Sequence, residues 1–141
     1  MIESKKVFLD TAPFIYYLEK HESYYRILKS LFIDWFKKDQ EMITSVLAVE
    51  EYCVNPYRIK EFERVKTFEE FIDYMEIDVV PINEQIARKA AQIRAEYKGF
   101  KAMDALQLAT AVIAGCDMFL TNDKQLRQFK EIKCITVDEL E

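Results

Sequence analysis

The sequence predicts an α/β fold with a short, mainly parallel central sheet, and three observations favour it. Short apolar runs that suit buried strands alternate with longer segments whose apolar residues recur at helical spacing. Half of the 141 residues are hydrophobic, which is enough to form one core. The chain has neither an internal repeat nor a linker-like stretch. We therefore expect a single domain over residues 1–141.

The first element is a strand at Val7-Phe8-Leu9, a run of strand-forming residues that ends at Asp10. Thr11 can cap the helix that follows, and Pro13 fits its first turn, where a missing N–H group costs little. This helix should end near His21, a surface residue suited to a C-cap. Because ligands bind outside the carboxyl ends of strands in open α/β sheets, Asp10 lies where a reaction would take place.

The middle of the chain is expected to contain three helices and two strands. Ser45 is a good cap for the second of these helices, and Asn55-Pro56 should end it. The helices are predicted over Glu22–Asp39, Val46–Val54 and Ile59–Met75, and the strands over Met42–Thr44 and Ile77–Pro81. The residues expected to face the core from the first and third helices are Leu28, Leu31, Phe32, Trp35, Phe36, Phe62, Val65, Phe68, Ile72 and Met75.

The last part of the chain repeats the alternation of helix and strand. Asn83 can cap the next helix, which stops before Gly99. The helix predicted over Lys101–Ala114 is almost wholly apolar beyond Asp104, so it should be buried. The remaining elements are a strand over Met118–Thr121, a short helix over Lys124–Phe129 and a strand over Cys134–Val137.

Charge, cysteine content and hydropathy limit the function. A net charge of −5 argues against binding nucleic acid through bulk positive charge, so action on nucleic acid would require bound cations. The three cysteines form no CxxC pair, which favours reduced, buried thiols in a cytoplasmic protein over a disulfide framework or a zinc site. No apolar run reaches the roughly 20 residues of a membrane span, and residues 1–6 lack the apolar segment of a signal peptide.

Four acids lie where the predicted elements would bring them to one edge of the sheet. Asp10 and Asp123 each follow a strand, while Glu51 and Asp104 lie near the starts of helices. Acidic side chains are rarely buried unless they are paired or bind a metal, and carboxylates that converge favour a cation between them. Ligands that are all oxygen suit Mg²⁺ or Mn²⁺.

Each acid also has a purely structural explanation. Asp10 can be a turn residue, Asp104 an acid favoured by the helix dipole, and Asp123 a helix cap. Glu51 can form a solvated pair with Glu50. Four separate explanations at corresponding ends of successive elements are less economical than one acidic site.

Four segments together resemble the signature blocks of the PIN-domain family, and most of all its small VapC-like toxin endoribonucleases. These segments, in the family's order, are FLDTAPFIYYLE, ITSVLAVEEYCVNP, MDALQLATA and FLTNDKQL. The resemblance covers essentially the whole chain. It implies a sheet of about five parallel strands with helices on both faces. It also implies an acidic Mg²⁺ or Mn²⁺ site that cuts RNA.

The resemblance assigns roles to particular residues. The acids it implies to be catalytic and metal-binding are Asp10, Glu51, Asp104 and Asp123. Alignment on Ser45 selects Glu51 as the second acid, with Glu50 as the alternative. Ser45 and Thr121 are hydroxyl residues that could orient the phosphate or a water. Where many members have His, this chain has Gln107.

The mechanism implied is hydrolysis of RNA phosphodiester bonds by a metal-activated water, with 5′-phosphate and 3′-hydroxyl products. Members of this kind usually form homodimers, and the toxins among them are inhibited by a small antitoxin protein. A metal-free ribonuclease that uses two histidines as acid and base is excluded, because His21 is the only histidine. A haloacid-dehalogenase-type phosphatase is excluded because the position of its second aspartate holds Ala12.

A second class of function stays open from the residues alone. This is a non-catalytic or housekeeping PIN module that binds RNA or a partner protein without an antitoxin. The presence of all four acids favours the enzyme. A group of basic residues could form an RNA-binding strip or only a solvated helix face: Arg58, Lys60, Arg64 and Lys66.

Overall fold

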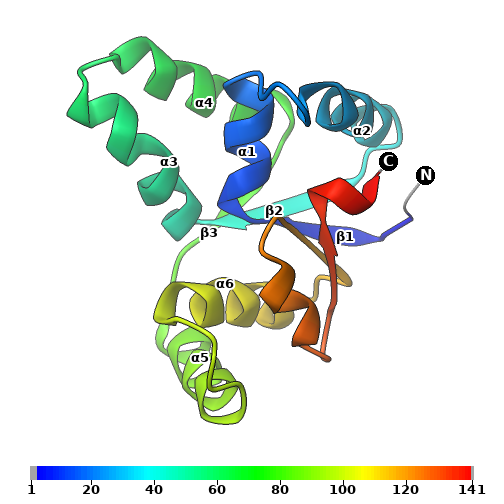
Figure 1. Ribbon diagram of the computed structural model, residues 1–141, viewed down its shortest axis with the longest axis vertical. Coiled ribbons are helices and arrows are strands. Elements are labelled where there is room, and N and C mark those ends of the chain that lie inside the picture. Colours follow the sequence, from blue (N-terminus) through cyan, green and yellow to red (C-terminus); the bar gives the residue numbers. More distant parts are fainter. Residues whose placement is uncertain (1–2, 141) are drawn as a thin grey trace.

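A five-stranded parallel sheet lies at the centre of the structure, a computed structural model that describes residues 3–140 (Figure 1). The strands are β1 (Lys6–Leu9), β2 (Glu41–Ser45), β3 (Asp78–Val80), β4 (Met118–Thr121) and β5 (Lys133–Thr136). Their order is β3-β2-β1-β4-β5, and each neighbouring pair is parallel. The predicted α/β fold is confirmed.

Helices cover both faces of this sheet. They are α1 (Thr11–Leu18), α2 (Tyr25–Lys37), α3 (Val46–Arg58), α4 (Phe62–Tyr74), α5 (Glu84–Glu96) and α6 (Ala102–Ile113), with short 3₁₀ helices η1 (Lys124–Gln128) and η2 (Val137–Leu140). Figure 1 shows α1 to α4 on one side of the sheet and α5 and α6 on the other. Side chains alternate along a strand, so Val7 and Leu9 enter the core under α1 to α4, while Phe8 enters the core under α5 and α6.

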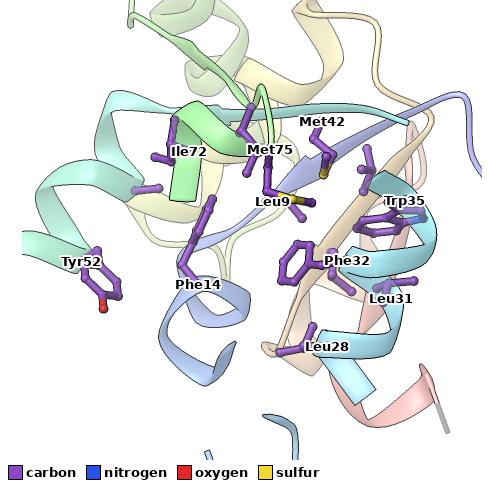
Figure 2. Close-up of a cluster of buried hydrophobic side chains, with 14 of the residues drawn as sticks. Leu9, Phe14, Leu28, Leu31, Phe32, Trp35, Met42, Tyr52, Ile72 and Met75 are labelled. Carbon is purple, nitrogen blue, oxygen red and sulfur yellow. The ribbon is translucent and has the colours of Figure 1, made fainter. Parts of the chain in front are cut away.

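Aromatic rings fill much of both cores. Under α1 to α4, Phe14 meets Phe68 edge-to-face with ring centroids 5.3 Å apart, and Figure 2 shows Phe14, Phe32 and Trp35 gathered around Leu9. On the other face, Phe8 and Phe119 stack on neighbouring strands with centroids 5.0 Å apart. Both rings are completely buried. The two cores therefore hold β1 and β4 firmly side by side.

The main departures from the predicted elements occur around the connection of α3 and α4. Pro56 does not end α3, which continues to Arg58. The ring is buried, and its missing N–H group removes one helical hydrogen bond, a loss that α3 tolerates for the two residues that remain to its end. Phe62 is 59% exposed because it begins α4 rather than lying within it, and Phe36 is 47% exposed against Tyr74. Both were expected to face the core, and for both the prediction was wrong.

Caps and termini were predicted with mixed success. Ser45 and Asn83 cap α3 and α5, as expected. α1 ends earlier than expected, with Glu19 as its C-cap, and His21 lies beyond it. The Nδ1 atom of His21 accepts hydrogen bonds from the backbone of Ser23 and Tyr24, so this ring organises the start of α2.

Two other properties can be checked over the described residues. All three cysteines are free and buried, as expected. Among residues 3–140, no helix combines the length and the apolar character that crossing a bilayer requires.

Candidate active site

Asp10 lies at the carboxyl end of β1, the central strand of the sheet. Its backbone amide donates to the carbonyl of Leu120, which ties it to the neighbouring strand β4. Asp10 is also the N-cap of α1, because its Oδ1 atom accepts a 2.9 Å hydrogen bond from the amide of Thr11. The sequence had assigned this cap to Thr11. The sheet order reverses around β1, which is where ligands bind in open α/β folds.

Side chains from two further elements hold the Asp10 carboxylate. The hydroxyl of Thr121, at the end of β4, donates to Oδ2 over 2.7 Å. The amide nitrogen of Gln107, on α6, makes a longer contact of 3.4 Å to Oδ1. The Gln107 amide oxygen in turn accepts from the hydroxyl of Ser45. Both oxygens of Asp10 are therefore oriented by donors, Oδ2 from β4 and Oδ1 from α6.

Glu51, rather than Glu50, reaches this network. The hydroxyl of Thr11 donates to the Oε1 atom of Glu51 over 2.6 Å, directly beside Asp10. Glu50 is exposed and lines a surface hollow with Cys53 and Tyr57. The two acids differ because neighbouring positions of a helix point to different sides of it.

Asp104 and Asp123 are placed near the network without joining it. The carboxylate of Asp104 accepts from the amide of Lys101 over 3.1 Å and so caps α6, one turn before Gln107. The carboxylate of Asp123 caps η1, while its backbone amide donates to the Thr121 hydroxyl over 3.1 Å. Over residues 3–140, no three acidic, histidine or cysteine side chains are grouped closely enough to hold a metal ion. Asp10 and Glu51 are thus the pair that the structure brings together.

The environment of Asp10 works against its negative charge. Burial raises the pKa of Asp10 above its ordinary value, and the nearby charge of Glu51 adds to the rise. Hydrogen bonds from Thr121, Thr11 and Gln107 lower this pKa in part. A cation would favour the ionised form, and carboxylate and hydroxyl oxygens are donors that suit a hard divalent ion. The chemistry of these donors therefore fits Mg²⁺ or Mn²⁺.

The two hydroxyl residues expected to orient substrate or water are turned toward protein groups. Ser45 is completely buried and Thr121 is 1% exposed. The Ser45 hydroxyl oxygen also accepts a hydrogen bond from the backbone amide of Leu47, which makes Ser45 the N-cap of α3. The Thr121 hydroxyl donates directly to Asp10, whereas the Ser45 hydroxyl acts on Asp10 through Gln107.

Sequence reasoning missed two contacts of this network. Gln107 is 2% exposed, and its signal was a lone amide in an otherwise apolar helix, on the face of Asp104. Thr11 was read as a helix cap, and nothing local indicated its bond to Glu51. Arg64 of the basic group is paired with Glu19 at 2.7 Å, and the rest of that group is exposed, as a solvated helix face would be.

Comparisons with known proteins agree with this architecture. One chain of a DNA-bound VapBC complex from Salmonella typhimurium superposes with a TM-score of 0.76 at 20% identity, over 94% of this chain and 98% of that chain. One chain of a toxin–antitoxin complex from Klebsiella pneumoniae superposes with a TM-score of 0.70 at 22% identity, over 94% of this chain and 98% of that chain. One chain of VapBC2 from Rickettsia felis, bound to a DNA fragment of its promoter, superposes with a TM-score of 0.70 at 19% identity. The superposition covers 92% of this chain and 97% of that chain.

At these identities the structural likeness concerns the fold. A search of curated proteins found none that matches. A family model described as PIN domain matches residues 7–132, which is most of the chain, and includes every acid discussed above. The chain belongs to the PIN-domain family.

Proposed function

We propose that this protein is a metal-dependent endoribonuclease that hydrolyses RNA phosphodiester bonds in the cytoplasm, as the toxin of a toxin–antitoxin pair. The observation that carries the proposal is the largely buried carboxylate of Asp10, held by Thr121 and Gln107 and linked through Thr11 to Glu51. Membership of the PIN-domain family supports nuclease chemistry. The toxin role is supported by the similar folds found in VapBC and other toxin–antitoxin complexes.

The acids proposed to hold Mg²⁺ or Mn²⁺ are Asp10, Glu51, Asp104 and Asp123. When bound, the ion would supply an activated water and stabilise the negative charge of the phosphate. Asp10 has to be ionised for this role, although burial favours its neutral form. Three donors keep both of its oxygens in a fixed orientation, which limits reorganisation when the ion binds.

An experiment with matched variants tests the enzyme. The purified protein is given an end-labelled mixed RNA pool with Mg²⁺, with Mn²⁺ or with EDTA. Asp10→Asn and Glu51→Gln should reduce cleavage by more than the roughly 100-fold that loss of an outer-shell partner costs. Glu50→Gln is the control, because this exposed neighbour should leave the rate unchanged. Cleavage that survives in Asp10→Asn or in EDTA would mean that another nuclease or another site is responsible.

The proposed partners are an RNA substrate, a small antitoxin protein and a second copy of the chain. Expression of the wild type should arrest bacterial growth, and Asp10→Asn should relieve the arrest. A small gene beside this one, expressed together with it, should also relieve the arrest and bind the chain. Light scattering should give twice the mass of the chain, and a monomer would refute the homodimer.

A second candidate function has one observation in its favour. Over the described residues, the carboxylates of Asp104 and Asp123 cap helices and make no hydrogen bond to Asp10 or Glu51. A PIN module that binds RNA or a partner protein without cutting, and without an antitoxin, would tolerate this separation. Such a module predicts RNA binding that survives EDTA, with no cleavage by the folded wild type.

A further inference from the structure

Tyr16 links α1 to the loop that carries Asp123. The side-chain amide nitrogen of Asn122 donates a 2.7 Å hydrogen bond to the Tyr16 hydroxyl. Asn122 stands between Thr121 and Asp123, two residues assigned above to the candidate site. Within residues 3–140, the Asn122 side chain makes this one hydrogen bond.

Helix α1 holds this loop at two separate points. At the start of the helix, the Asp10 carboxylate accepts from Thr121. Further along the same helix, Tyr16 accepts from Asn122. The pairing of β4 and the Thr121 contact fix the start of this loop, and the Tyr16 contact adds a second restraint just beyond the end of the strand. Asp123 follows directly, and its amide donates to the Thr121 hydroxyl that makes the first attachment.

The Tyr16 ring is itself held in place. Its centroid lies 4.6 Å from that of His21 and 5.1 Å from that of Tyr24. His21 is oriented by the backbone amides of Ser23 and Tyr24, which both donate to Nδ1. The ring therefore presents its hydroxyl from a fixed position, and Tyr16→Phe would remove the hydroxyl while keeping the ring contacts.

We propose that Tyr16 is a positioning residue that fixes Asp123 relative to Asp10, acting through Asn122. The inference rests on the proposed function, because it gives Asp123 a part in metal binding and cleavage. One hydroxyl outside the acids, that of Tyr16, thus controls how well those acids work. Loss of this hydroxyl should weaken the site without loosening the fold.

Three variants and one control test the inference. The variants are Tyr16→Phe, Asn122→Ala and the double substitution. The control is Tyr24→Phe, since that hydroxyl makes no hydrogen bond within residues 3–140. Each protein is measured for Mn²⁺ affinity, kcat and KM with RNA, thermal midpoint, and hydrogen exchange of the Asp123 amide.

The Tyr16→Phe protein should bind Mn²⁺ more weakly and show a lower kcat, each by about three- to tenfold, which is the scale of one lost hydrogen bond. The KM for RNA should stay close to that of the wild type, the thermal midpoint should fall by no more than the few degrees that one hydrogen bond is worth, and Tyr24→Phe should match the wild type throughout. Because Tyr16 acts through Asn122, the double variant should be no worse than the more impaired single variant. Equal effects of Tyr16→Phe and Tyr24→Phe, or additive effects in the double variant, would overturn the inference.

Hydrogen exchange separates this inference from the proposed function, because it requires neither RNA nor metal. The Asp123 amide should exchange faster in Tyr16→Phe and in Asn122→Ala, and at the wild-type rate in Tyr24→Phe. Unchanged exchange in Tyr16→Phe overturns the positioning role even if the protein cleaves RNA. Faster exchange supports that role even if the wild type leaves RNA intact, a result that would count against the proposed function alone.

Discussion

Replacing Asp10 with Asn should stabilise the metal-free protein at neutral pH while it abolishes the proposed cleavage. Burial and the charge of Glu51 raise the pKa of Asp10, so the folded chain favours a neutral side chain at this position. Asparagine is neutral and nearly the same size. Its amide oxygen can still accept from Thr11 and Gln107, which both donate to the same Asp10 oxygen.

The size of the gain is a difference between opposing contributions. An ionised, largely buried carboxylate loses much of its hydration, which disfavours folding. The donors Thr11, Thr121 and Gln107 offset part of that loss, and after the substitution only the Thr121 hydroxyl has to turn. We expect a net gain of about 0.5–2 kcal/mol, the range typical of a single stabilising substitution. For a chain of this length that corresponds to about 2–6 °C in Tm.

The gain should depend on pH in a definite direction. Because the folded-state pKa of Asp10 is raised, its contribution to stability is fully present below the unfolded-state pKa. That contribution is lost as the pH rises through the folded-state pKa. The Asp10→Asn protein lacks the titrating group, so its advantage over the wild type should be largest at neutral pH and should shrink as the pH falls.

Trp35 offers a direct assay, because it is the single tryptophan and is 1% exposed. Its fluorescence reports Tm in EDTA across a pH series. Asp73→Asn serves as the control, since Asp73 is exposed on α4 and should change stability by less than about 0.5 kcal/mol. Added Mn²⁺ should raise the Tm of the wild type but not that of Asp10→Asn. A lower Tm for Asp10→Asn at neutral pH in EDTA would refute the reasoning.

Four further predictions concern the fold. Phe119→Ala, which empties a fully buried site, should cost about 3–5 kcal/mol in chemical denaturation; Phe62→Ser, at a site 59% exposed, should change stability by less than about 0.5 kcal/mol. Burial raises the pKa of the Cys116 thiol to about 12, so at pH values near 8 it should react with a thiol reagent only after denaturant is added. Arg64→Met removes the partly exposed ion pair with Glu19 and should cost about 0.5–1 kcal/mol at low salt, a difference that should shrink in concentrated NaCl.

Local chemistry explains what could be predicted from the sequence. The strand at Val7-Phe8-Leu9 was recognisable because an apolar run ends abruptly at a polar residue. Ser45 and Asn83 were recognisable as caps because their short side chains reach the first free amides of a helix. Pro56 was misread because its effect depends on how close it lies to the helix end, which tertiary packing decides.

The candidate site was less accessible to sequence reasoning, since contacts between distant elements define it. Alignment on Ser45 had selected Glu51 over Glu50, but the contact with Thr11 that distinguishes them depends on how α3 is rotated against α1. The role of Gln107 appears only once α6 packs beneath the central strands. The assignment of the four acids to a metal stays a prediction, for which the experiments above are designed.

The parallel pairing of β1 with β4 has a consequence for folding of the chain during its synthesis on the ribosome. Asp10 is made early, but its partners come from β4, the last strand but one: Thr121 orients its carboxylate, and the Leu120 carbonyl accepts from its amide. A nascent chain that has not yet passed Thr121 can form much of the core under α1 to α4 and still lacks an assembled site. A product cut short before β4 would therefore lack both the strand that pairs with β1 and the hydroxyl that orients Asp10.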